Sequence, residues 1–171
     1  KHPDGVFVED TAVVLDGAAI LCRPGAESRL LETASVEAVL RGSVKKLVRM
    51  RAPGTLDGGD VLRIGKTLFV GLSTRTNADG IRQLTDFSAA HGFEVRTVHI
   101  QECLHLKTAI SSLGDGAILA NPRWVDLAPF SGFRVIRVAE GEPFAANSLT
   151  VGDTLLHPAE HPLTAAALRA Q

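Results

Sequence analysis

An internal repeat with a period of about 40–50 residues limits the folds available to this sequence. Each repeat contains two short apolar runs joined by a two-residue step such as Asp-Gly, Gly-Lys or Gly-Asp, and these steps favour β-hairpins because their turns need positive φ. Hairpins are predicted at 13–21, 61–70, 109–119 and 149–156. One hairpin cannot bury its own apolar face, so the units are expected to pack on one another.

Extended and helical segments separate the predicted hairpins. Strands are predicted before three of the hairpins, at 46–50, 93–100 and 133–138. Helices are predicted at 26–41, 77–91 and 163–170, where apolar residues recur near every 3.6 positions. The connection 121–132 contains two prolines and is expected to have lost its helix. The predicted unit is therefore strand, loop, hairpin and helix.

The alternation of strands and helices predicts an α/β fold and excludes an all-β propeller. The units could close pseudosymmetrically around an axis, or they could form an open α/β sheet. We favour the closed arrangement, because the loop before each hairpin carries distinctive polar residues. The 171 residues suffice for one domain with a sizeable core, so 1–171 is interpreted as a single domain.

The polar loops before the hairpins are the expected place for chemistry. They lie at 8–10, 57–60, 105–107 and 145–148. Asp57 and His105 fall at the same point of successive repeats, 48 residues apart, so closure of the units would bring them to one pocket. A pocket lined by carboxylates suits a ligand rich in N–H donors, such as a guanidinium. A metal is the less favoured occupant, because one histidine alone falls in these loops and no dense ligand spacing is present.

Composition excludes several other classes of function. The net charge of -1 gives no basic footprint for nucleic acid or an anionic membrane. No apolar run approaches the roughly 20 residues of a membrane span. Two cysteines are too few for a disulfide framework, so a reducing compartment, the cytoplasm, is expected.

Five ordered motifs resemble the dimethylarginine dimethylaminohydrolases, a family of the guanidine-modifying (pentein) superfamily. The motifs are Pro3–Asp10, Arg23–Arg29, Leu56–Val61, Gly71–Asn77 and Leu104–Lys107. The resemblance implies a pseudosymmetric five-bladed α/β propeller, of which about three and a half blades would be present, as a pentein catalytic domain truncated at both ends. It implies no cofactor and no metal.

The resemblance also implies a reaction and a set of site residues. Members hydrolyse Nω-methylated arginine to citrulline and a methylamine through a cysteine thiouronium intermediate. His105 matches the acid–base residue, and Asp57 matches the carboxylate that orients it or holds the guanidinium. The substrate-binding positions are matched by Asp4, Glu9, Asp10, Arg29 and Arg75, with the two arginines near the substrate carboxylate.

Lys107 distinguishes between branches of the superfamily. Arginine deiminases and amidinotransferases carry an acidic residue at this position, two residues after the histidine. A lysine there favours the dimethylarginine hydrolase reaction over the deiminase reaction. Because a positive charge would repel a cationic substrate, we expect the Lys107 side chain to point away from it.

The nucleophilic cysteine of the family lies in a fifth repeat near the C-terminus, and its motif does not occur in this sequence. Cys103 precedes His105 by two residues but is expected to be an inert, partly buried thiol, and Cys22 is expected in the core. We therefore expect these residues to belong to a longer enzyme and to be inactive alone. The alternatives are an arginine or guanidine deiminase and a non-catalytic guanidinium-binding protein. Incomplete units leave exposed edges, so a homodimer is also considered.

Overall fold

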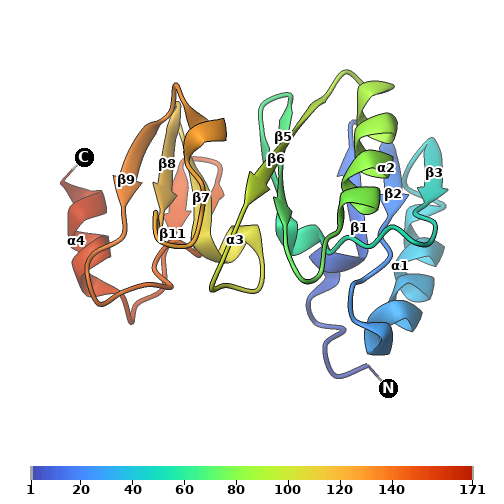
Figure 1. The fold of residues 1–171 in the computed structure, drawn as a ribbon, viewed down its shortest axis with the longest axis horizontal. Coiled ribbons are helices and arrows are strands. Elements are labelled where there is room, and N and C mark those ends of the chain that lie inside the picture. The colour runs from blue at the N-terminus through green and yellow to red at the C-terminus, as the bar shows by residue number, and fades with distance from the viewer. Residues whose placement is uncertain (1, 171) are drawn as a thin grey trace.

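The computed structural model describes residues 2–170, so Lys1 and Gln171, the ends of the predicted domain, lie outside the described residues. It contains four small sheets and the helices that connect them, and Figure 1 shows the first two sheets with α1 and α2 at one end and α4 at the other. The first sheet comprises β1 (Ala12–Leu15), β2 (Ala18–Leu21) and β3 (Lys46–Arg49). The second comprises β4 (Val61–Ile64), β5 (Thr67–Leu72) and β6 (Glu94–His99). The third comprises β7 (Ile110–Gly114), β8 (Ala117–Ala120) and β9 (Arg134–Arg137), and the fourth comprises β10 (Leu149–Val151) and β11 (Thr154–Leu156).

The four predicted hairpins are confirmed, and their turns explain why. In β1–β2, Leu15 pairs with Ala18 across a two-residue turn. Both turn residues have positive φ, 42° at Asp16 and 87° at Gly17, as a type I′ turn requires. That turn matches the natural twist of the two strands, so the short apolar runs on either side form an antiparallel pair.

The unit predicted from the sequence is wrong in one respect. The sequence pattern places the strand at 46–50 in one unit with the hairpin that follows it, but β3 pairs in parallel with β2, in the sheet of the hairpin before it. The same holds for β6 beside β5 and for β9 beside β8. A parallel strand must be reached by a crossover connection, which the helix between hairpin and strand provides. The observed unit is therefore hairpin, crossover, strand.

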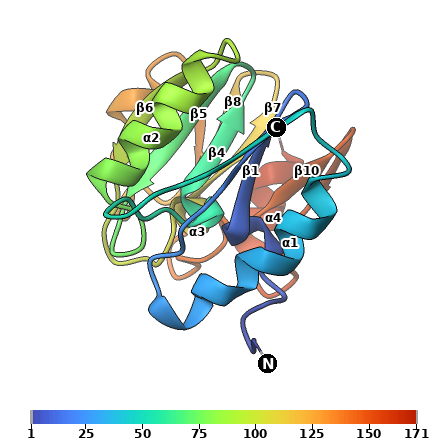
Figure 2. The same cartoon turned by 90° about the vertical axis from the view of Figure 1, so that its right-hand side faces the viewer.

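The connecting helices follow the predicted pattern. The region 26–41 forms a 3-10 helix, η2 (Glu27–Glu32), that continues into α1 (Thr33–Leu40). The helix predicted at 77–91 is α2 (Ala78–Ala89), whose N-terminus is capped by the Asn77 side chain accepting from Gly80 N at 2.8 Å, and the C-terminal helix is α4 (Pro162–Arg169). The proline-containing connection keeps one 3-10 turn, η4 (Ala128–Phe130). Figure 2 shows α2 lying along β5 and β6.

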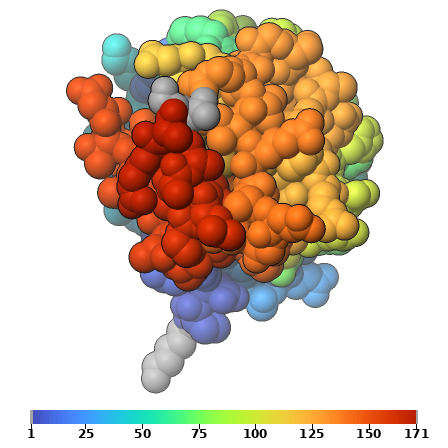
Figure 3. All heavy atoms as spheres, turned by 90° about the vertical axis from the view of Figure 1, so that its left-hand side faces the viewer, coloured from blue at the N-terminus to red at the C-terminus, as the bar shows by residue number. Residues whose placement is uncertain are grey.

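The core lies between successive sheets, because adjacent residues of a strand point to opposite faces. In β5, Leu68 and Val70 pack in the cluster shared with the first sheet, and Phe69 packs in the cluster shared with the third. Phe69 stacks on Phe130, with ring centroids 4.2 Å apart. In β8, Leu119 faces a third cluster toward the C-terminal end, whose surface, with α4 in dark red, is seen in Figure 3. The second and third sheets are thus stacked layers with apolar contacts on both faces.

Three short helical turns lead into the first three hairpins, and four of the predicted site residues, Glu9, Asp10, Asp57 and His105, lie in them or directly before them. The turns are η1 (Val8–Thr11), η3 (Gly58–Asp60) and α3 (Leu106–Ala109). The turns η1 and α3 both contact η3, so the loops before the hairpins do meet in space. Within residues 2–170, no helix is long and apolar enough to cross a membrane. Closure of the units into five blades stays a prediction.

Candidate active site

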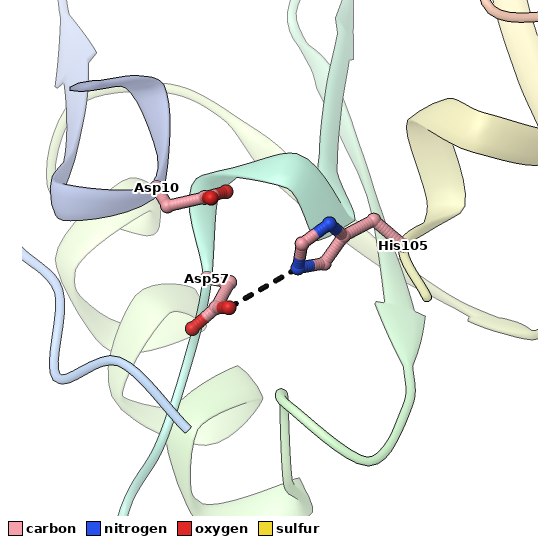
Figure 4. Close-up of side chains that lie close together, drawn as sticks. All are labelled: Asp10, Asp57 and His105. Carbon is pink, nitrogen blue, oxygen red and sulfur yellow. Dashed lines mark hydrogen bonds and ion pairs between the residues drawn. The ribbon is translucent and has the colours of Figure 1, made fainter. Parts of the chain in front are cut away.

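The Asp57–His105 pair predicted from the repeat is formed in the structure. His105 Nε2 lies 3.1 Å from Asp57 Oδ2, as Figure 4 shows. The Asp57 carboxylate is fully buried and its other oxygen accepts from Gly25 N at 2.9 Å. Both oxygens are therefore held, and the carboxylate is fixed relative to the imidazole ring.

The environment of His105 favours its protonated form. Burial by itself lowers the pKa of the imidazole, since a charged ring is costly in a dry site. The hydrogen bond with Asp57 and the negative charges of Asp60 and Asp10 outweigh burial, so the pKa of His105 is raised above its ordinary value. A histidine with a raised pKa stays protonated to higher pH and can donate that proton as a general acid.

Asp10 closes the site from the first repeat. Its Oδ1 accepts from Gly59 N at 2.7 Å, which ties η1 to η3. Close packing explains the two glycines of η3: a Cβ on Gly58 would lie 1.8 Å from the Glu9 carbonyl oxygen, and one on Gly59 would lie 2.8 Å from the His105 ring. The Gly-Gly step, which looks like a simple turn in the sequence, therefore makes room for the acidic segment and for the histidine.

Arg29 is at the wall of the site, but its guanidinium is bound to protein acceptors. Nη1 donates to Asp10 at 2.7 Å, Nε and Nη2 donate to Glu32 at 3.0 and 2.9 Å, and Nη2 also reaches the carbonyl oxygens of Asp4 and Phe7. Burial opposes the charge, but these hydrogen bonds to Glu32 and Asp10 outweigh it and raise the pKa of Arg29. Arg29 therefore holds the acidic segment in place, and its contact with a substrate carboxylate stays a prediction.

A pocket of about 260 Å³ opens beside this cluster. Its wall includes His105, Asp10 and Arg29, and the remaining predicted residues Asp4, Glu9 and Arg75 also line it. Asp57 lies behind His105, outside the lining. The position of Asp57 therefore favours orientation of the histidine over direct contact with a guanidinium.

Arg75 differs from Arg29 in having its charge available. Among residues 2–170, no carboxylate forms a salt bridge with the half-buried Arg75 guanidinium. Its backbone N–H donates to Ser73 Oγ at 2.9 Å, which fixes the segment that presents the side chain to the pocket. An arginine in this setting can bind a carboxylate bidentately.

Lys107 lines the pocket, so the expectation that it points away from the ligand site is wrong. Its Nζ donates to Glu9 Oε2 at 2.5 Å. The ion pair explains the position: the carboxylate offsets the ammonium charge, and the two groups come from segments that the fold brings together at the pocket mouth. The pair also leaves Glu9 with less negative charge for a cationic ligand.

The two thiols are poorly suited to act as nucleophiles. Burial and the negative charge of Asp60 raise the pKa of Cys103 to about 11, and its Sγ lies 3.5 Å from the carbonyl oxygen of His105. Cys22 is buried in the core, and burial raises the pKa of its thiol still further. Both thiols therefore stay protonated at neutral pH.

One set of side chains could geometrically surround a cation. Atoms of Asp10, Asp57 and His105 lie within 4.8 Å of one another. Asp10 already binds Gly59 and Arg29, Asp57 already binds Gly25, and the His105 ring binds Asp57. We assign no metal to them, and the expected absence of a metal stays a prediction.

The sequence did not reveal the role of the polar residues that support the pair, although Asp60 falls in one of the predicted loops. Asp60 is fully buried and accepts hydrogen bonds from Ser73, Thr76 and the Leu106 backbone. Both segments could have been singled out as functional from the sequence. Asp60 ends the Asp-Gly-Gly-Asp segment, and Ser73–Thr76 lies in another of the matched motifs. Nothing in the sequence alone indicates that the two segments meet.

Comparison with known proteins agrees with the motifs. Residues 3–155 match the family described as "Arginine deiminase". The N(G),N(G)-dimethylarginine dimethylaminohydrolases of Pseudomonas aeruginosa and Streptomyces coelicolor are 39% and 43% identical over 96% and 97% of this chain. The chain spans 65% and 64% of the length of these two relatives.

A solved structure gives the same result. The P. aeruginosa enzyme, as a cysteine-to-serine mutant in complex with citrulline, superposes with a TM-score of 0.93 at 35% sequence identity. The alignment covers 99% of this chain and 67% of that one.

Proposed function

Because this chain belongs to the arginine deiminase family, in the branch of the dimethylarginine dimethylaminohydrolases, we propose that a protein carrying it hydrolyses Nω-methylated arginine to citrulline and a methylamine. The observation that carries the proposal is the hydrogen bond between buried Asp57 and His105, because His105 lines a pocket that also presents carboxylates and an arginine with no carboxylate partner among the described residues. We further propose that the stacked units are blades of a five-bladed pentein domain.

In the proposed complex, the two ends of the amino-acid substrate meet opposite charges. The carboxylate is bound by Arg75, whose planar fork suits two parallel hydrogen bonds. The guanidinium lies against the acidic wall formed by Asp10 and Glu9, with Asp4 at the rim of the pocket.

His105 acts as the acid–base residue of the proposed reaction. A cysteine thiolate attacks the guanidinium carbon, and protonated His105 donates a proton to the departing methylamine, which leaves a thiouronium ester. The neutral histidine then takes a proton from the water that releases citrulline. Asp57 keeps the ring oriented through both steps, and its negative charge stabilises the imidazolium form.

The thiolate is proposed to come from a segment outside these 171 residues. Cys103 keeps its proton, with a pKa of about 11, and its thiol contacts the His105 backbone oxygen. Cys22 is buried in the core. We therefore propose that the 171-residue chain alone releases no citrulline.

The deiminase reaction on unmethylated arginine is the second candidate, because its family model covers residues 3–155. Lys107 argues against it: the ammonium group pairs with Glu9, so fewer acceptors face the terminal N–H groups of an unsubstituted guanidinium. Methyl groups on the guanidinium remove N–H donors and so need fewer acceptors.

The experiment is a product assay on the full-length protein that contains this chain. Citrulline and dimethylamine formed in equal amounts from asymmetric dimethylarginine would support the proposal. Ammonia release from arginine as the preferred reaction would assign the deiminase. Binding of both guanidines without turnover would assign the non-catalytic binding protein.

A further inference from the structure

We propose that Asp60 is the positioning residue that sets the geometry of the Asp57–His105 pair. Asp60 ends η3 and is fully buried, three residues after Asp57. Its carboxylate accepts from Ser73 Oγ at 2.6 Å, from Thr76 Oγ1 at 2.6 Å and from the Leu106 N–H at 2.9 Å. All three partners donate, so the network fits the ionised carboxylate, which accepts only.

One oxygen of Asp60 fixes the histidine side of the pair. Oδ1 accepts the N–H of Leu106, the first residue of α3, and His105 is the N-cap of that turn. A fixed peptide directly after His105 limits the direction in which its Cα–Cβ bond can point. Space for this contact is reserved at Gly71, where a Cβ would lie 2.9 Å from Asp60 Oδ1 and 3.0 Å from the Leu106 Cβ.

The other oxygen fixes the carboxylate side. Thr76 Oγ1 donates to Asp60 Oδ2 and accepts from the Asp57 N–H at 3.2 Å. The threonine hydroxyl is therefore a bridge between the two aspartates, and it anchors the backbone of Asp57. Ser73 Oγ donates to the same oxygen of Asp60 and accepts from the Arg75 N–H at 2.9 Å. One buried carboxylate thus joins the segments that present Asp57, Arg75 and His105.

The charge of Asp60 supports His105 in addition to the hydrogen bonds of its carboxylate. A buried carboxylate near His105 stabilises the imidazolium, together with Asp57 and Asp10. The other charged groups at the pocket wall are Arg29, Arg75, Lys107, Asp4 and Glu9, and Lys107 is paired with Glu9. Asp60 does not line the pocket and so does not touch a ligand there. The importance of Asp60 for catalysis rests on the proposed function. The effect of Asp60 on the pKa and orientation of His105 is independent of that function.

The test is an NMR titration of the His105 ring in the full-length protein, which requires no substrate. In Asp60→Asn, we expect the His105 pKa to fall by roughly one pH unit. We also expect hydrogen exchange of the Leu106 amide to speed up about tenfold, because its acceptor is weakened. The matched control is Asp126→Asn, since Asp126 also accepts a backbone N–H, from Ala128 at 2.9 Å, in an exposed loop away from the pocket. The control should change neither quantity.

A folded Asp60→Asn variant with the wild-type His105 pKa and Leu106 exchange rate would overturn the proposal. If Asp60→Asn does not fold, Thr76→Val decides, because it removes the bridging hydroxyl and keeps the shape of the side chain. We expect a smaller fall of the His105 pKa in Thr76→Val, with Thr76→Ser retaining the wild-type value. An unchanged pKa in Thr76→Val would equally overturn the proposal. Failure of guanidine turnover in the full-length protein would contradict the proposed function without affecting either titration.

Discussion

Substitution of Gly59 by alanine tests the packing of the His105 ring directly. An added Cβ would lie 2.8 Å from Cγ and Nδ1 of His105 and 2.9 Å from Asp10 Oδ1. Carbon atoms in contact prefer about 3.5 Å or more, so the ring must move by about 0.7 Å. A displacement of that size along the bond would lengthen the 3.1 Å contact between His105 and Asp57 to about 3.8 Å, beyond hydrogen-bonding distance.

The expected loss of stability combines overpacking with the loss of a charge-assisted hydrogen bond. Each effect contributes about 1–3 kcal/mol, so we expect a total near 3 kcal/mol. For a chain of this length, such a loss lowers Tm by about 6–12 °C. Thermal unfolding followed by circular dichroism measures it, with Gly42→Ala as the control, since the nearest atom to its added Cβ lies at 3.9 Å. Equal Tm values for the two variants, with unchanged His105 NMR shifts, would show that an added Cβ at position 59 does not displace the His105 ring.

Three other predictions concern charges in the site. The pKa of His105 is higher in the folded than in the unfolded protein, so protonation of His105 stabilises the fold. This stabilisation is fully present below the unfolded-state pKa of about 6.5 and is lost as pH rises through the folded-state pKa. His105→Gln should therefore flatten the fall in stability over that range in urea titrations, and an identical slope would contradict this. Arg29→Met should cost about 3–5 kcal/mol in the same assay because it leaves the Asp10 and Glu32 carboxylates buried without their cation, whereas Arg75→Met should change stability by less than about 1 kcal/mol. Equal costs would show that Arg29 is not the structural arginine. In the full-length protein, Lys107→Met should lower KM for arginine more than KM for dimethylarginine, because Glu9 is released to accept guanidinium N–H groups. The control is Lys66→Met, at an exposed ion pair with Asp16, which should leave the ratio of the two KM values unchanged.

Local features of the sequence were sufficient to predict the hairpins and helices. Two-residue turns with glycine or aspartate determine hairpin position through φ alone, so the β1–β2 turn at Asp16 and Gly17 could be located without tertiary information. The pairing partner of the third strand in each sheet could not be predicted from local features. Whether the strand at 46–49 joins the hairpin before or after it depends on the path of the crossover, and no local pattern records that path.

The candidate site also has features that the sequence predicts and features that it does not. The spacing of Asp57 and His105 in successive repeats predicted that they meet, because equivalent loops converge. The ion pairs that Arg29 forms with Asp10 and Lys107 forms with Glu9 could not be predicted, since each partner lies on another segment of the chain. Charge pairing across the fold decides where a long side chain points, and a linear motif contains only one member of each pair.

The most direct test of the catalytic role of His105 is citrulline release by the full-length protein and by its His105→Gln variant. With asymmetric dimethylarginine as substrate, we expect equal amounts of citrulline and dimethylamine from the wild type. We expect a loss of at least about 100-fold in the variant, since acid–base catalysis typically contributes that much. A variant that turns over dimethylarginine at the wild-type rate would contradict the assignment of the Asp57–His105 pair as the catalytic acid–base.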